Sequence, residues 1–218
     1  MSSTVQAAAT GHDDSHDLVP EDKHFGQATG GKIAMWMFIA QDGMSFGGLL
    51  FAYGVLRASA ADWPVPSDVL GIPLTAAATF LLICSSLTMV FAVEAAKERN
   101  QAALVRMLGL TILGGATFLG IQVYEYYHLV HAGIGFSTST FAGEDLNNLF
   151  GTTFYAVTGF HGLHVLSGVI YLICILRGAM AGKYTEGGIS WSPVELVGLF
   201  WHFVDLVWIL VFTFIYLL

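Results

Sequence analysis

The sequence predicts an all-α integral membrane protein, a bundle of five transmembrane helices. Of its 218 residues, 55% are hydrophobic and only 11% are charged, and the mean hydropathy is +0.67. A soluble domain carries about 25% charged residues, so this chain has too few polar side chains to cover a water-facing surface. The apolar residues also come in five runs. Each run is long enough to cross a hydrocarbon core, which takes about 20 helical residues.

A polar segment precedes the five runs. Residues 1–31 are rich in Ser, Thr, Ala, Gly, Asp and His and show no apolar period, which predicts a disordered N-terminal tail. The His and Asp residues of this tail could hold a metal loosely, but a flexible acidic tail is the favoured interpretation. It is not a signal peptide, because the first apolar run begins only near Ile33. Residues 32–218 are predicted to form the membrane domain, with spans near 33–56, 70–94, 104–130, 150–177 and 194–218.

The connections between the runs carry helix breakers and polar residues. Trp63, Pro64 and Pro66 follow the first run, and a charged turn at residues 97–100 follows the second. Residues 133–148 are polar and contain glycine, and the last connection ends at Pro193. A transmembrane β-barrel would show short alternating segments instead, so helices are predicted.

The distribution of basic residues orients the chain. With five spans, the tail, the second connection and the fourth connection lie on one side of the membrane. That side holds seven of the eight Lys and Arg residues, and Arg57 alone lies on the other. The positive-inside rule therefore predicts a cytoplasmic N-terminus and a periplasmic C-terminus in a bacterial inner membrane. The lack of a basic cluster argues against nucleic acid as a partner.

Ionisable side chains lie inside the runs. Such a group at mid-bilayer costs about 2.5–3.5 kcal/mol, so each needs a partner or a function. Two histidines lie one helical turn apart in the fourth run, and two acids and a histidine share a face of the fifth. The eight candidates are Asp42, Glu94, Glu125, His161, His164, Glu195, His202 and Asp205.

Three kinds of role suit these groups. Hydrogen bonds between helices are the favoured one. Binding lipid headgroups or tuning protons comes second, and a metal or haem site, built from the paired histidines and a carboxylate, comes third. Cys84 and Cys174 lie in apolar runs without a CxxC spacing and are predicted to be buried small hydrophobes. No arrangement of a nucleophile with a base is evident, so these residues alone do not reveal a reaction.

Two segments carry a family resemblance. Residues 152–165, TTFYAVTGFHGLHV, and residues 200–208, FWHFVDLVW, resemble the most recognisable segments of subunit III of haem-copper oxidases, in the same order and at the same spacing. Residues 122–127, QVYEYY, and Glu94 before the charged turn also fit. The resemblance covers about residues 32–218.

The resemblance implies an accessory role in a respiratory terminal oxidase that reduces O₂ to water. A subunit III carries no catalytic residue and no metal of its own. It packs against subunit I, which holds haem and copper, and its complex includes subunit II. It binds phospholipid in a cleft between helices and supports proton uptake and the durability of the catalytic centre. The chain lacks the copper-binding Cys and Met cluster of a subunit II and the longer set of spans of a subunit I.

The resemblance also implies roles for the candidate residues. Asp42 matches an intramembrane carboxylate of the family, where glutamate is usual, and His164 is expected as its neighbour. All eight candidates are expected to bind lipid or to support proton transfer. Many members of the family have seven spans, and two of these form one wall of the lipid cleft. This chain has five predicted spans and lacks that wall. Either another subunit supplies it, or the cleft is more open.

Three alternatives stay open at this point. The chain could bind haem or a metal itself through His161, His164 and His202. It could serve a nitric-oxide reductase. A small transporter is less attractive, because no internal repeat or broken helix is evident.

Overall fold

The computed structural model describes residues 30–136, 140–141, 144–145, 148–184 and 190–218. The tail predicted to be disordered lies, up to residue 29, outside the described residues, and so does the loose metal site considered for it.

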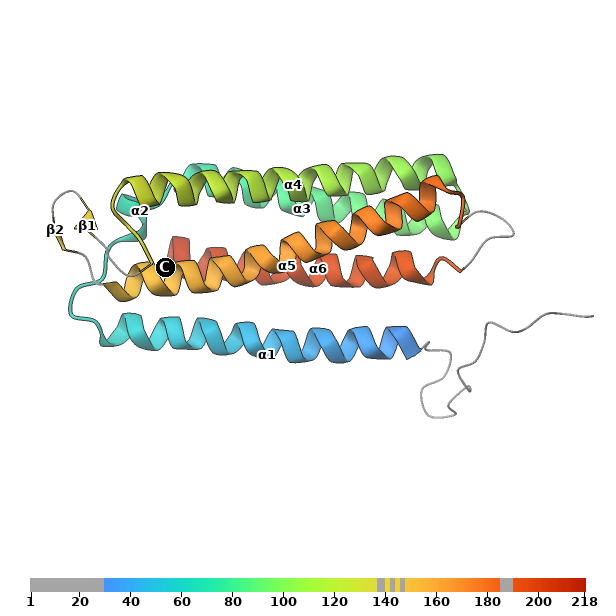
Figure 1. Ribbon diagram of the computed structural model, residues 1–218. Coiled ribbons are helices and arrows are strands. Elements are labelled where there is room, and N and C mark those ends of the chain that lie inside the picture. The colour runs from blue at the N-terminus through green and yellow to red at the C-terminus, as the bar shows by residue number, and fades with distance from the viewer. Residues whose placement is uncertain (1–29, 137–139, 142–143, 146–147, 185–189) are drawn as a thin grey trace, which may run out of the picture.

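Five long helices make up the bundle, which confirms the predicted fold class (Figure 1). They are α1 (Gly30–Ser59), α3 (Ile72–Lys97), α4 (Gln101–His131), α5 (Asn148–Met180) and α6 (Ser192–Phe212), which continues into a π-helix, η1 (Thr213–Leu217). All five are long and apolar enough to cross a membrane. They extend past the predicted spans by a few residues, because a helix of 31 residues such as α4 is about 46 Å long at 1.5 Å per residue. The hydrocarbon core is only about 30 Å thick.

The connections contain short elements. A single helical turn, α2 (Pro66–Val69), precedes α3, and a two-stranded antiparallel sheet, β1 (Thr140–Phe141) and β2 (Glu144–Asp145), lies between α4 and α5. The register pairs Thr140 with Asp145 and Phe141 with Glu144. This sheet was not predicted, because strands of two residues are too short to show an alternating pattern.

The α3–α4 turn is stabilised locally. Arg99 takes a left-handed backbone conformation with φ of 56°, and the Asn100 side chain accepts a hydrogen bond from the amide of Ala103 at 3.1 Å. An Asn at this position satisfies one of the free amides at a helix start. The charged turn predicted at residues 97–100 therefore joins the end of α3 to the start of α4, and Asn100 caps α4.

The two ends of the bundle differ. One end, called here the Lys97 end, holds the start of α1, the α3–α4 turn, the end of α5 and the start of α6 (Figure 1). The other, called the Trp63 end, holds α2, the β1–β2 sheet and Leu218. At the Trp63 end Arg57 donates a hydrogen bond to the carbonyl of Leu218. This contact joins the end of α1 to the end of η1.

The α6 helix lies among α1, α3 and α5 and carries two tryptophans into the core. Trp201 Nε1 donates to Ser85 Oγ at 3.1 Å and Trp208 Nε1 donates to Thr79 Oγ1 at 2.8 Å. An indole N–H inside a membrane needs such an acceptor, because an unpaired donor there is costly. Both acceptors are on α3, so the two bonds fix the rotation of α6 against α3.

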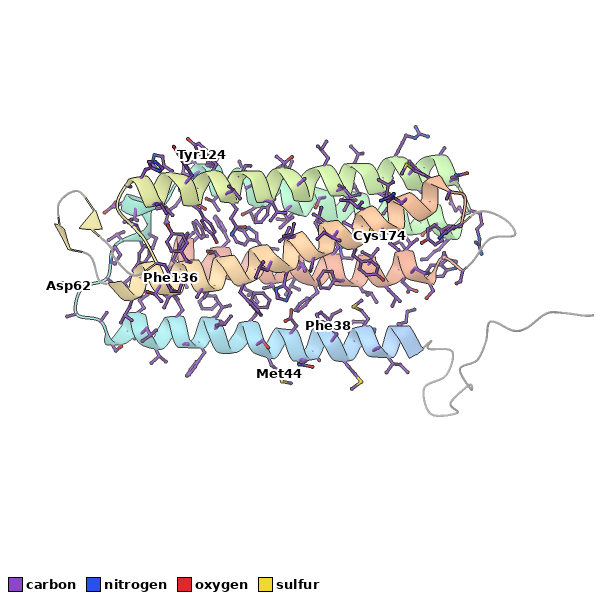
Figure 2. All side chains as sticks on the ribbon, viewed as in Figure 1. Phe38, Met44, Asp62, Tyr124, Phe136 and Cys174 are labelled. Carbon is purple, nitrogen blue, oxygen red and sulfur yellow. The ribbon has the colours of Figure 1, made fainter. Side chains whose placement is uncertain are left out.

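The α1 helix is the least buried of the five. It packs on α6 and α5 through Asp42, Phe46 and Tyr53, its three buried residues. Side chains fill the interior between the helices, and Met44 points away from the bundle on the opposite face of α1 (Figure 2). The buried face of α1 therefore contains a carboxylate at its middle.

Candidate functional site

Asp42 and His164 form a contact between α1 and α5. Asp42 is only 8% exposed, and its Oδ2 lies 3.2 Å from Nε2 of His164. This confirms that His164 is the histidine beside Asp42 and that the carboxylate faces the bundle. Phe46 covers the pair, with its ring centroid 5.1 Å from that of His164 and 4.9 Å from that of Phe160.

The other nitrogen of His164 determines which protons the pair can hold. Nδ1 lies 2.8 Å from the carbonyl oxygen of Phe160. Because a carbonyl only accepts, Nδ1 must carry hydrogen, and Nε2 is the nitrogen that faces Asp42. The two atoms are within ion-pair distance, but their alignment does not make a directed hydrogen bond, since Oδ2 has no hydrogen-bond partner among the described residues. The contact can hold one proton between a carboxyl group and an imidazole.

His161 packs differently from His164. It is fully buried, and its ring lies against Trp208 with centroids 4.8 Å apart and against the edge of Phe118 at 6.0 Å. Neither ring nitrogen has a hydrogen-bond partner among the described residues. The favoured interpretation, a hydrogen bond between helices, is therefore wrong for His161, whose described contacts are with aromatic rings.

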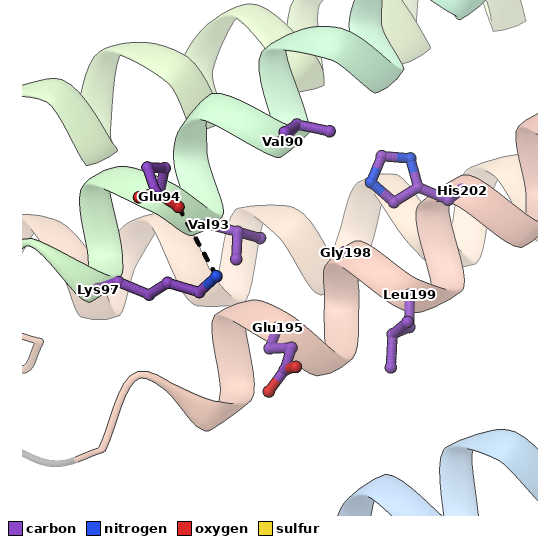
Figure 3. Close-up of a pocket in the computed structure, with 8 residues that line it drawn as sticks. All are labelled: Val90, Val93, Glu94, Lys97, Glu195, Gly198, Leu199 and His202. Carbon is purple, nitrogen blue, oxygen red and sulfur yellow. Dashed lines mark ion pairs between the residues drawn. The ribbon is translucent and has the colours of Figure 1, made fainter.

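Charged side chains gather at the Lys97 end around a cavity of about 170 Å³ between α3 and α6 (Figure 3). Lys32 Nζ lies 2.7 Å from Glu195 Oε1, and Lys97 Nζ lies 3.6 Å from Glu94 Oε2. His202 lines the same cavity and its Nδ1 lies 3.0 Å from Ser86 Oγ. Val90, Val93 and Leu199 add apolar walls. The cavity thus combines the Glu94–Lys97 ion pair, the Glu195 carboxylate and an apolar lining, and Lys32 pairs with Glu195 from α1.

Asp205 does not line this cavity, although its spacing places it on the same face of α6 as Glu195 and His202. It is 8% exposed, and its Oδ1 has no hydrogen-bond partner among the described residues. Of the three residues predicted to share a face of the fifth span, Glu195 and His202 line one cavity. Asp205 lies outside that lining but interacts with Ser86, the hydrogen-bond partner of His202.

Glu125 forms a third cluster, near the Trp63 end. Its Oε2 accepts a hydrogen bond from the hydroxyl of Tyr216 at 2.7 Å, and its Oε1 lies 2.9 Å from Thr75 Oγ1. The three residues come from α4, η1 and α3. Glu125 was predicted as a site residue, whereas Thr75 and Tyr216 were not, because each is an ordinary residue of an apolar run.

The structure therefore distributes the eight candidates over separate places. In the described part of the chain, no three His, Cys, Asp or Glu side chains come close enough together to hold a metal ion. The cluster at the Lys97 end also includes Lys32, Lys97 and Ser86, which were not predicted as site residues. For Lys32 and Lys97, the sequence signal that could have identified them is a basic residue within one helical turn of the end of an apolar run.

The prediction for the cysteines is wrong. Cys84 and Cys174 are free and exposed on the outside of the bundle. A helix face toward lipid is as apolar as a helix face toward the core, so an apolar run does not indicate which of its residues are buried.

The Lys32–Glu195 pair yields a stability prediction. Lys32→Glu replaces the ammonium group that lies 2.7 Å from Glu195 Oε1 by a second carboxylate, and we expect it to lower the thermal midpoint of the purified protein. The effect is modest, about 0.5–1 kcal/mol, because both side chains are partly exposed and water screens the pair. The double variant Lys32→Glu/Glu195→Lys should recover most of the loss; equal midpoints for the single and double variants would show that the pair does not stabilise α1.

These observations define a class of protein: a multi-pass α-helical membrane protein in which several carboxylates and histidines lie in contacts between helices. The family model for cytochrome c oxidase subunit III matches residues 16–218, and the chain belongs to this family.

Known relatives agree with this assignment. The chain is 38% identical over 181 residues to a probable cytochrome c oxidase subunit 3 of Nocardia farcinica, covering 83% of this chain and 84% of the relative. It is 34% identical to cytochrome c oxidase subunit 3 of Alkalihalophilus pseudofirmus, covering 85% of each. It is 30% identical to cytochrome bo(3) ubiquinol oxidase subunit 3 of Pseudomonas aeruginosa, covering 94% of this chain and 93% of the relative.

Proposed function

We propose that this chain is a non-catalytic core subunit of a respiratory haem-copper terminal oxidase. It packs on catalytic subunit I beside subunit II, binds structural phospholipid, and supports proton uptake and durability while the complex reduces O₂ to water. The haem and copper belong to the partner subunits. The relatives include subunits of both cytochrome c and ubiquinol oxidases, so either a cytochrome or a quinol is compatible as electron donor.

The observation that carries the proposal is the buried Asp42–His164 contact. A carboxyl group in the middle of a span is expensive unless it has a partner and a function. Here the partner is an imidazole whose second nitrogen is held by a backbone carbonyl, so the pair is oriented to hold or exchange one proton. Asp42 stands where the family resemblance implies an intramembrane carboxylate, usually a glutamate, with His164 as its neighbour.

The cavity at the Lys97 end supports phospholipid binding. Its lining holds Lys97, Glu94 and Glu195, and Lys32 of α1 pairs with Glu195 beside it. These charges lie near the ends of helices α1, α3 and α6, where a lipid headgroup meets the bundle. Its apolar wall of Val90, Val93 and Leu199 suits the start of an acyl chain. Glu94, Glu195 and His202 are thus proposed headgroup contacts.

The position of basic residues supports a cytoplasmic Lys97 end. Lys32, Lys97 and Arg99 lie there, whereas Arg57 lies at the Trp63 end. By the positive-inside rule the Lys97 end faces the cytoplasm of a bacterial cell, and Leu218 at the Trp63 end lies on the periplasmic side of the inner membrane.

Purification from the native membrane tests this proposal. We expect a tagged chain to co-purify with oxidase subunits I and II in mild detergent, with haem and copper retained by those partners. Isolation of this chain alone with stoichiometric haem or copper would contradict the accessory role. Co-purification with the catalytic subunit of a nitric-oxide reductase would contradict the assignment to a terminal oxidase.

A further inference from the structure

The Glu125 cluster contains a buried acid that the proposed function does not require. Glu125 is 7% exposed, and its hydrogen-bond partners Thr75 and Tyr216 are also buried. The titratable groups that interact with its carboxyl are three tyrosines, at positions 126, 155 and 216. No Lys, Arg or His of the described residues forms an ion pair with it. An ionised carboxylate in this place would be an uncompensated buried charge.

The hydrogen atoms around Glu125 can all be placed if its carboxyl group is protonated. Tyr216 donates to Oε2. Thr75 has one hydroxyl hydrogen, and the carbonyl of Gly71 lies 3.2 Å from its Oγ1 as an acceptor. The hydroxyl of Thr75 has two acceptors within reach, Oε1 of Glu125 at 2.9 Å and the carbonyl of Gly71. When it donates to Gly71, a protonated Oε1 of Glu125 can donate to Oγ1 of Thr75. A chain Glu125→Thr75→Gly71 then satisfies each hydrogen without any net charge.

A neighbouring network leaves one acceptor unused. Gln122 Nε2 donates to the carbonyl of Thr158 at 3.0 Å and to the hydroxyl of Tyr126 at 3.2 Å. The Tyr126 hydroxyl lies 2.7 Å from Thr158 Oγ1, which donates to the carbonyl of Phe154 at 2.6 Å. Both amide hydrogens of Gln122 are therefore used, which fixes the orientation of the amide. Its Oε1 is buried without a partner among the described residues, and Gln122 is 6% exposed.

A small cavity joins the two networks. It is lined by Gln122, Glu125, Thr75, Ala78 and Trp208 among others, and about 10 Å³ of it is open to the centre of a water molecule. That volume is about the minimum that holds one water, and a buried water needs two or more polar partners. Gln122 and Glu125 both line this cavity, so the unused Oε1 of Gln122 and the carboxyl of Glu125 are the acceptors available to such a water.

We propose that this cavity binds one ordered water and that Glu125 carries its proton. The water donates one hydrogen to Oε1 of Gln122 and the other to the carboxyl group of Glu125. The result is an uncharged, hydrated acid that connects α3, α4 and η1 at the Trp63 end. It is separate from the Asp42–His164 contact and from the cavity at the Lys97 end, so it does not depend on their proposed roles.

Infrared difference spectroscopy on the purified complex tests the proton. The spectrum of the wild type minus that of the Glu125→Gln variant should show the C=O stretching band of a carboxylic acid, and this band should shift in D₂O. Loss of carboxylate bands instead would overturn the proposal. Glu98→Gln is the matched control, because Glu98 is exposed at the α3–α4 turn and its removal should change carboxylate bands alone.

Stability measurements give an independent test. A Gln at position 125 can donate to Thr75 and accept from Tyr216 as the neutral acid does, so Glu125→Gln should retain the wild-type thermal midpoint. Tyr216→Phe removes one donor and should lower the midpoint in the same way in the wild-type and Glu125→Gln backgrounds. A Glu125→Gln variant that loses the subunit while Tyr216→Phe is tolerated would indicate an ionised Glu125 and overturn the proposal.

A high-resolution cryo-electron-microscopy map of the complex tests the water. We expect a density peak within hydrogen-bond distance of Gln122 Oε1 and the Glu125 carboxyl. A map that resolves other buried waters but leaves this cavity without a peak would overturn the water site.

Discussion

Replacing Gly115 by alanine is expected to be the most damaging single-methyl change in the bundle. A Cβ at this position would lie 2.4 Å from Cη2 of Trp201 and 2.9 Å from Cγ2 of Val169. Trp201 cannot move away easily, because its indole is buried and its Nε1 is bonded to Ser85. Overpacking of a well-packed core costs about 1–3 kcal/mol, so we expect a lower thermal midpoint and partial loss of the subunit from the complex.

Gly120→Ala is the control for this prediction. Gly120 lies on the same helix, α4, but no atom lies within 4 Å of a Cβ built there. Alanine at an unhindered helical position gains about 0.5–1 kcal/mol over glycine, so this variant should be as stable as wild type or slightly more so. Similar midpoints for the Gly115→Ala and Gly120→Ala variants would contradict the close approach of α4 to Trp201.

A second substitution tests the mechanism of the contact. Trp201→Phe removes the distal ring atoms that Gly115→Ala would meet. The double variant should therefore lose less stability than the sum of the two single variants, measured as a double-mutant cycle of thermal midpoints. Strict additivity would show that the two residues do not touch.

Asp42→Ala is expected to have the largest functional effect. The variant should still assemble, because Phe46 and Tyr53 continue to pack α1 against the bundle, but the complex should inactivate after fewer turnovers and retain less lipid. The physical reason is that His164 Nε2 loses the carboxyl oxygen that lies 3.2 Å from it. Removing one partner of a buried polar contact costs about 1–3 kcal/mol. Turnover number before inactivation and phospholipid content of the purified complex are the measurements.

Three companion variants separate packing from protonation at this position. Asp42→Asn keeps the shape and a hydrogen-bonding group but cannot ionise, so it should inactivate like Asp42→Ala. Asp42→Glu keeps the carboxyl group and should be close to wild type. Asp62→Ala changes an exposed acid of the α1–α3 connection and serves as the control. Wild-type durability and lipid content in both Asp42→Ala and Asp42→Asn would show that Asp42 serves packing alone.

The number and order of the spans, and one contact between them, could be predicted from the sequence. Length and apolar composition are sufficient for the spans, because a helix is the way a single chain segment satisfies its backbone in lipid. The contact between Asp42 and His164 followed from depth and from the family pattern, since both lie near the middle of their spans. Charge distribution along the chain gave a predicted orientation in the membrane.

The rotation of each helix about its own axis could not be predicted. In a soluble protein the polar face of a helix indicates the side toward water, but lipid is as apolar as a protein core, so both faces of a span look alike. This explains why Cys84 and Cys174 were expected inside and lie outside. It also explains why His161 was expected to form hydrogen bonds between helices and instead lies against Trp208.

The sequence by itself thus determined a five-helix membrane subunit and which of its residues are too polar for lipid. Only the tertiary structure decided how those residues are grouped: Asp42 with His164, Glu195 with Lys32, and Glu125 with Thr75 and Tyr216. Each pair joins residues far apart in the chain. Such pairs depend on where helices cross and how they are turned, which close packing around Gly115, Trp201 and their neighbours determines.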